Sequence, residues 1–324
     1  GLGKGWMGIL FAVLMIITFG FAYNSVQSNT ICLAWQKAFG FEPATMGIVL
    51  TVLTLLIIFG GIQRVAKFSS TVVPLMAIVY LLIAVGVVIW NITSLPKVLL
   101  TIIENAFGFN QAAGGVLGIT VIQGIKRGLF SNEAGEGSAP NAAAVATVSH
   151  PVKQGLIQAL GVFTDTLVVC SCTAFIILVS GVDVTASNGI QLTQDALTHE
   201  IGGIGNPFVA VMIWLFAFSS IIGNYYYGET NVRYIKDSKL GVFIYRLAVA
   251  AMVMVGAVVS LDFAWSFADI TMALLTLCNL VAIVLLSRQA VFLLQDYRKQ
   301  KKEGKNPVFK KDMMPEIADQ LEAW

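Results

Sequence analysis

The sequence is poor in charge, histidine and cysteine, and each shortage excludes a class of protein. Only 12% of the residues are charged, whereas soluble domains carry about 25%. The four cysteines lie within or beside apolar stretches, where small buried thiols are more common than disulfides or metal ligands. His150 and His199 stand alone in predicted loops. The sequence therefore contains no pattern for a soluble enzyme or a metal centre.

Apolar residues make up 57% of the chain, and its mean hydropathy is +0.80. A helix that spans a bilayer needs about 20 mostly apolar residues, and barrel-type alternation is absent. We therefore predict an all-α polytopic membrane protein with a transmembrane region over residues 1–287 and eight spanning helices. Their predicted ranges are 7–30, 46–63, 72–92, 112–127, 155–181, 207–228, 242–261 and 266–287.

The basic residues predict the orientation, because cytoplasmic loops carry the excess of Lys and Arg. With the N-terminus inside, only Lys37 and Lys97 of the twenty basic residues fall outside. Residues 288–324 then form a basic cytoplasmic tail, which we expect to touch anionic lipid headgroups. The predicted location is the cell membrane, with several passes and a cytoplasmic C-terminus.

A glycine-rich polar block follows the fourth predicted span. Residues 123–140 read QGIKRGLFSNEAGEGSAP, and this block resembles the signature of the alanine/glycine:cation symporters, the sodium:alanine symporter family. The resemblance extends over essentially the whole chain. It implies a secondary active transporter rather than an enzyme, which carries a small neutral amino acid, alanine or glycine, together with Na⁺ by alternating access. The same resemblance leaves H⁺ coupling open as an alternative, and it implies neither an organic cofactor nor a nucleic-acid partner.

The resemblance also implies a fold similar to that of the leucine transporter, with inverted repeats around a site at the membrane midplane. The eight spans then correspond to core helices three to ten of ten. The sequence opens GLGKGW without an initiator Met, so we expect a chain truncated at its N-terminus that lacks the first broken helix. The sequence does not indicate the oligomeric state.

The fourth span is a poor helix interior, because each glycine costs about 1 kcal/mol relative to alanine. We expect unwinding around Gly115 and Gly118, which exposes backbone N–H and C=O groups to a carboxylate, an ammonium or Na⁺. The alternative is that these glycines only allow close helix packing. Gly115, Gly118, Thr120 and Gln123 are the predicted substrate-binding residues of this span.

The first span carries polar residues on one helical face. Phe21, Asn24 and Ser28 share that face, and one aromatic ring with small polar groups suits a zwitterion. The alternative is that the amides join helices by hydrogen bonds. The resemblance favours a pocket role for Phe21, and Gln27 is a coupling candidate.

In the sixth span, the carbonyl of Phe216 and the hydroxyls of Ser219 and Ser220 lie on one helix face. Three oxygens suit a hard cation, and the spacing is similar to the sodium site of the leucine-transporter fold. Serines also bond back to their own helix, which is the competing interpretation. Ser220, Gly223 and Asn224 are further substrate candidates. Family members often have Thr-Thr and Trp here, so Asn224 weakens the prediction of a strict alanine or glycine preference.

Charged residues near the spans complete the prediction. Asp165 is the acid nearest the middle of a span, where an unpaired carboxylate is costly, so we expect a coupling or support role. We place Asp269 near the outer end of the last span, with its basic partner in the missing region. The remaining coupling or gate candidates are Lys126, Arg127, Glu133 and Glu229, with Lys126 and Arg127 marking the cytoplasmic face. We expect Glu133 and its neighbour Glu136 to be solvated or paired with those two basic residues.

Two other classes fit less well. An ion channel needs a continuous polar stripe or a filter motif, whereas the polar positions here are separated by apolar residues. An intramembrane enzyme needs a nucleophile with a base, and GEGS at residues 135–138 is not the G-x-S-x-G elbow.

Overall fold

The computed structural model of the chain describes residues 3–60, 62–106, 114–315, 318 and 321. The described residues form helices and connecting loops without a strand, which agrees with the predicted all-α membrane class. Helix α1 (Gly5–Met15), a π-helical segment (Ile16–Tyr23) and α2 (Asn24–Phe39) together form one long span. A left-handed Gly40 ends α2 at φ 72°, a conformation that glycine adopts without strain.

The next helices are shorter or bent. Helix α3 (Pro43–Ile58) has 16 residues. Helix α4 (Ile62–Trp90) contains Pro74, and its part from Pro74 onward meets α5 (Leu95–Ala106) at a bend of 102°. Helix α6 (Gly114–Asn132) precedes the one-turn α7 (Ala139–Ala143).

A second π-helical segment interrupts the following span. Helix α8 (Pro151–Thr164), the segment Asp165–Cys170 and α9 (Ser171–Ser180) follow one another without a gap. Helix α10 (Ile190–Ile201) leads through a short 3₁₀ turn (Gly202–Ile204) into α11 (Gly205–Ile235). Helices α12 (Lys239–Val258) and α13 (Leu261–Lys302) follow, and a 3₁₀ turn occupies Lys311–Met313.

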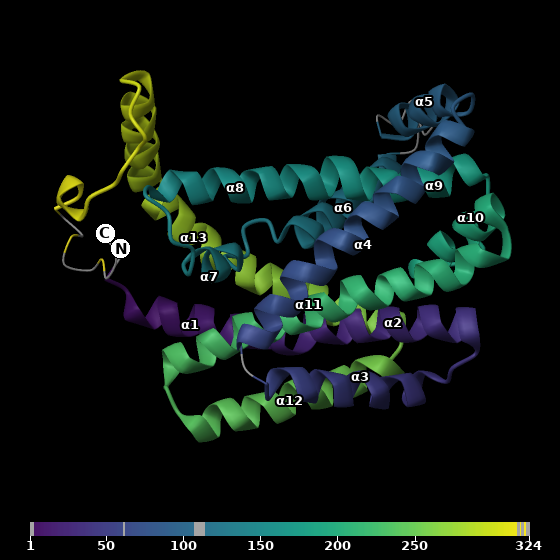
Figure 1. The fold of residues 1–324 in the computed structure, drawn as a ribbon, viewed down its shortest axis with the longest axis horizontal. Coiled ribbons are helices and arrows are strands. Elements are labelled where there is room, and N and C mark those ends of the chain that lie inside the picture. Colours follow the sequence, from purple (N-terminus) through teal and green to yellow (C-terminus); the bar gives the residue numbers. More distant parts are fainter. Residues whose placement is uncertain (1–2, 61, 107–113, 316–317, 319–320, 322–324) are drawn as a thin grey trace.

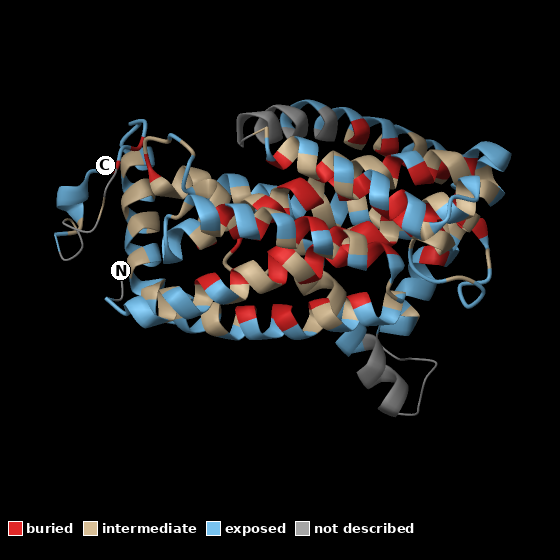
Figure 2. Cartoon of the chain, turned by 90° about the horizontal axis from the view of Figure 1, so that it is seen from below, coloured by how far each residue is buried: buried red, intermediate tan, exposed pale blue. Residues whose placement is uncertain are grey.

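Helix α11 lies at the centre of the bundle, in contact with α2, α4, α10 and α12 (Figure 1). Buried residues concentrate between the helices, and the outer faces carry exposed Leu, Ile, Val and Phe (Figure 2). Such apolar outer faces suit a lipid environment. A core of Ile31, Leu50, Phe218, Ile221 and Val253 joins α2, α3, α11 and α12.

Five stretches of the described residues are long and apolar enough to cross a bilayer, and the bent pair α4–α5 makes a sixth. Helices α3 and α6, which carry the predicted spans 46–63 and 112–127, are not among them. Residues 61, 112 and 113 of those ranges lie outside the described residues. The number of eight spans therefore stays a prediction.

Candidate functional site

A cavity of about 760 Å³ lies between α4, α8, α9, α10 and α11. Its lining is mostly apolar, with a few polar groups that suit recognition of a small zwitterion. Tyr80 and Thr173 share a hydrogen bond of 2.6 Å on its wall. The other polar lining residues are Thr164, Asp165, Thr193, Ser219 and Ser220.

The oxygen cluster predicted on the sixth span lies on this cavity. The Ser219 hydroxyl donates to the Phe216 carbonyl at 2.7 Å, and the Ser220 hydroxyl donates to the same carbonyl at 3.1 Å. The three oxygens are therefore close together, as their spacing predicted. Both hydroxyls bond back to their own helix in this arrangement. Each hydroxyl oxygen keeps lone pairs that can bind a cation, whereas the Phe216 carbonyl already accepts two hydrogen bonds.

Asp165 faces the same cavity from the start of the second π-helical segment. Its carboxylate accepts a hydrogen bond from the Ser131 hydroxyl at 2.7 Å. The widened π-helical turn re-aims side chains relative to an α-helix. The structure thus brings together Asp165 and the serine pair, which lie more than fifty residues apart in the sequence.

The substrate-binding and coupling candidates of the first span do not line the cavity. Asn24 is fully buried, donates to the Gly20 carbonyl at 3.0 Å and accepts from the amide of Asn224 at 3.2 Å. Ser28 donates to the Val253 carbonyl at 2.6 Å, and Phe21 packs against the cluster around Tyr225 and Tyr245. These contacts favour the interpretation that the polar face joins helices. Gln27 on α2 and Gly223 on α11 are half-buried.

The predicted unwinding of the fourth span is wrong. The backbone of Gly115 and Gly118 belongs to the continuous helix α6, and the π-helical segments occur in two other spans. Gln123 is exposed, and the side chain of Thr120 lies outside the described part of the chain. Hydrogen bonds along the helix outweighed the glycine penalty, which is only about 1 kcal/mol per residue.

The partners predicted for the basic residues of α6 also need correction. Arg127 does not end its helix, which continues to Asn132, and its guanidinium lies 2.5 Å from Asp269 on α13. It also lies over the Trp265 ring, 4.2 Å from the centroid. Lys126 approaches the same carboxylate at 3.5 Å. Asp269 thus finds its basic partners within this chain rather than in a missing region. These ion pairs also mean that the two predicted placements, Asp269 near the outer end of its span and Lys126 and Arg127 at the cytoplasmic face, do not both hold.

Glu136 is buried and Glu133 half-buried, and no ion pair among the described residues joins either of them to those basic residues. Glu136 is fully buried, and the Tyr23 hydroxyl donates to it at 2.7 Å. Glu133 adopts a φ of 48° and accepts a hydrogen bond from Ser138. Burial raises the pKa of the Glu133 carboxyl, and the bond from Ser138 opposes that rise. An acid within glycine-rich residues resembles a surface loop in the sequence, so its burial was missed.

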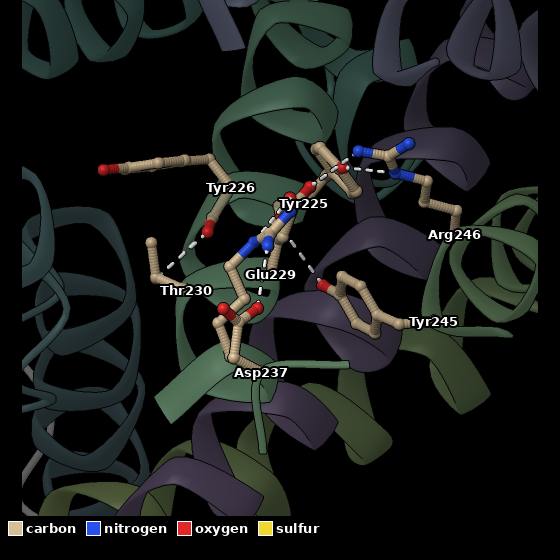
Figure 3. Close-up of polar contacts among 8 residues, drawn as sticks. Tyr225, Tyr226, Glu229, Thr230, Asp237, Tyr245 and Arg246 are labelled. Carbon is tan, nitrogen blue, oxygen red and sulfur yellow. Dashed lines mark hydrogen bonds and ion pairs between the residues drawn. The ribbon is translucent and has the colours of Figure 1, made fainter. Parts of the chain in front are cut away.

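Glu229 takes part in an ion-pair network between α11 and α12 (Figure 3). Its carboxylate lies 2.7 Å from Arg233 and 3.4 Å from Arg246. Arg246 also donates to the Tyr225 hydroxyl at 2.9 Å, and the Tyr245 hydroxyl donates to the Tyr225 carbonyl at 3.2 Å. Glu229 therefore does not line the cavity, and its ion pair with Arg246 connects α11 to α12.

His150 does not stand alone. Its Nδ1 accepts from the Val152 N–H at 3.2 Å, and its Nε2 lies 3.2 Å from Asp296 on α13. The first part of the basic tail is helical, since α13 continues to Lys302. Beyond that helix, the Phe309 N–H donates to the Ser149 carbonyl at 2.8 Å. The tail thus folds back onto the start of α8.

Tyr80, Thr173 and Tyr23 are polar residues of the interior that sequence reasoning missed. Tyrosine and threonine in an apolar span resemble ordinary core residues, so they gave no separate signal. Tyr23 is the neighbour of Asn24 in the first span, and its hydroxyl was not considered as a polar group there.

Comparison with known proteins points to one family. A sequence model described as "Sodium:alanine symporter family" matches residues 1–311. A probable sodium/glutamine symporter, GlnT of Bacillus subtilis, is 53% identical over 97% of this chain and 66% of its own length. The amino-acid carrier protein AlsT of the same organism is 52% identical over the whole of this chain and 69% of its own length.

The sodium/alanine symporter AgcS of Methanococcus maripaludis is 35% identical over 94% of this chain and 68% of its own length. The chain thus spans about two thirds of the length of these curated relatives.

Proposed function

Because the chain belongs to the sodium:alanine symporter family, we propose that it carries a small neutral amino acid across the membrane together with Na⁺. The family consists of transporters, not enzymes, and its members are cation-coupled amino-acid symporters. If Na⁺ completes the site and raises the affinity for the amino acid, the amino acid raises the affinity for Na⁺ by the same factor. The lipid bilayer is the environment in which this multi-pass protein works.

The observation that carries the proposal is the shared cavity of Asp165 and the serine pair. Its volume of about 760 Å³ accommodates a small amino acid. The hydroxyls of Ser219 and Ser220 and the carbonyl of Phe216 supply oxygens to Na⁺. Asp165 supplies a negative charge for Na⁺ or for the ammonium group of the substrate.

Alanine or glycine is the cargo we propose, since the Methanococcus relative is named a sodium/alanine symporter and the family resemblance adds glycine. The glutamine symporter is the reason to include a larger amide in any test. Asn224 lies on the same helix as the serine pair, but its amide is engaged with Asn24. H⁺ coupling remains the alternative coupling mode.

We also propose the architecture that the family resemblance implies. A leucine-transporter-like inverted repeat is supported by the π-helical interruptions and by the bend between α4 and α5. The excess of Lys and Arg on one side supports a cytoplasmic C-terminus. Labelling of single cysteines placed in the α4–α5 and α12–α13 connections tests this orientation.

Uptake into liposomes tests the proposed function. Purified protein is reconstituted, and radiolabelled alanine, glycine and glutamine are each offered under an inward Na⁺ gradient or an inward H⁺ gradient. We expect alanine accumulation that follows the Na⁺ gradient and collapses with a Na⁺ ionophore. Equal alanine binding with and without Na⁺ at every pH would contradict the proposal.

A further inference from the structure

The loop from Glu133 to Ser138 buries an acid that the proposed transport site does not use. We propose that Glu136 is a proton-binding site: its carboxyl holds a proton at neutral pH while the loop is packed against α1 and α13. The proposal rests on the packing of the loop, on the bond from Tyr23 and on the absence of a cation beside the carboxyl in the described residues.

Several contacts hold the loop in place. Asn279 on α13 donates to the Gly135 carbonyl at 2.8 Å. Gly137 has a φ of 78°, and an added Cβ would lie 2.8 Å from both Asn279 and Phe11. Only glycine fits this close approach with that backbone conformation. The loop is therefore clamped between α1 and α13, and Glu136 is fully buried there.

One carboxyl oxygen of Glu136 has a partner and the other has none. Oε1 accepts from the Tyr23 hydroxyl at 2.7 Å. Oε2 is buried and has no hydrogen-bond partner among the described residues. A buried carboxylate with a single hydrogen bond is costly, because an ionised group in an apolar setting needs paired charge or several donors. Protonation removes that cost without any movement of the loop.

The charged surroundings do not supply a counter-ion. Glu133 repels the Glu136 carboxylate from the same loop, and Asp269 on α13 lies within electrostatic reach of Tyr23. Tyr227 on α11 also lies within electrostatic reach of Glu133 and adds no positive charge. The nearest basic groups, Arg127 and Lys126 on α6, are engaged with Asp269. Within the described part of the chain, no ion pair includes Glu133 or Glu136.

Burial raises the pKa of the Glu136 carboxyl to about 8, the Tyr23 bond opposes the rise, and Glu133 adds to it. The folded chain therefore binds a proton that the unfolded chain has lost, between pH 4.5 and about pH 8. Since the unfolded state binds fewer protons in this window, the stability of the folded state falls as pH rises through it. Above the window, the contribution of Glu136 no longer changes with pH.

Infrared spectroscopy of the reconstituted protein tests the proposal independently of transport. The wild-type spectrum minus the Glu136→Gln spectrum should show the carbonyl stretch of a protonated carboxyl at neutral pH. That band should titrate with a midpoint near the pKa of about 8. Glu133→Gln should lower the midpoint because it removes a repelling charge, and Tyr23→Phe should raise it because it removes a bond to the ionised form.

Thermal unfolding gives a second readout. Glutamine has the shape of a protonated glutamic acid, so Glu136→Gln should fold and should lack the loss of stability at higher pH. The unfolding temperature of Glu136→Gln relative to wild type should therefore increase from about pH 4.5 to about pH 8 and then stay level. An ionised carboxylate band at neutral pH, a band that appears only when Na⁺ is removed, or a pH-independent difference in unfolding temperature would each overturn the proposal.

Discussion

The side-chain amide of Asn224 donates to the side-chain oxygen of Asn24 at 3.2 Å, although the two residues are 200 positions apart. Both side chains are buried. Asn24 begins α2 directly after the first π-helical segment, and Asn224 lies within α11. This bond joins the π-helical span to the central helix of the bundle, some way from the cavity that carries the serine pair.

Replacing either asparagine by alanine should destabilise the fold. Each single change leaves a buried partner unsatisfied, at a cost of about 1–3 kcal/mol. The double variant should lose less than the sum of the two single variants, because neither group is then orphaned. Thermal unfolding in detergent of the four proteins measures this coupling, and strictly additive losses would show that the bond contributes nothing.

The serine pair should set the Na⁺ dependence of uptake. We expect Ser219→Ala combined with Ser220→Ala to raise the Na⁺ concentration for half-maximal uptake roughly tenfold, since a lost ligand worth about 1.4 kcal/mol corresponds to that factor. Ser287→Ala is the matched control, because Ser287 makes the same backbone bond on α13, at 2.7 Å to Val284, away from the cavity. If Na⁺ dependence stayed the same while alanine affinity fell, the serines would bind substrate alone.

The sequence predicted helices well where apolar runs are long, because burial of apolar surface in lipid fixes such segments. Hydropathy marks the part of a helix that lies in the membrane and not the whole helix. The last span is predicted to end at residue 287, and the helix that carries it, α13, continues to Lys302 through a charged segment without a hydropathy signal. The helical spacing of Phe216, Ser219 and Ser220 could be read directly, because it depends on one helix alone.

Partners on other helices could not be read in this way. Arg127 and Asp269 are 142 positions apart, and their pairing depends on how α6 and α13 rotate against each other. The burial of Glu136 depends on Gly135 and Gly137, whose left-handed conformations fold the loop inward. The rotation of one helix against another, and the direction in which a loop folds, leave no periodic pattern in the sequence.

Gly256 should be required for the packing of α12 against α2. A Cβ at this position would lie 2.5 Å from the Ser25 backbone, which cannot move as a side chain does. Gly256→Ala should therefore cost about 1–3 kcal/mol of stability. Gly155→Ala on α8 is the control, because its Cβ would meet no atom within 4 Å, and it should be neutral or slightly stabilising. Equal unfolding temperatures for the two variants would contradict the close approach of α2 and α12.

The pair of Arg127 and Asp269 should depend on the shape of arginine as well as on its charge. The guanidinium donates to Asp269 at 2.5 Å and lies 4.2 Å from the centroid of the Trp265 ring. Lysine keeps the charge but cannot stack in the same way. We therefore expect Arg127→Lys to lose part of the stability that Arg127→Ala loses.

A double-mutant cycle of Arg127→Ala and Asp269→Asn, followed by thermal unfolding, measures the interaction itself. Both side chains are partly accessible, at 38% and 20% of their surface, so we expect a coupling of about 1 kcal/mol, close to the upper range for exposed pairs. In the Arg127→Ala variant, Lys126 remains 3.5 Å from Asp269 and preserves part of the electrostatic attraction between α6 and α13. Asp237→Asn removes the more exposed partner of Arg233 and should change stability little. A coupling no larger than the stability change caused by Asp237→Asn would mean that α6 and α13 are held together by apolar packing alone.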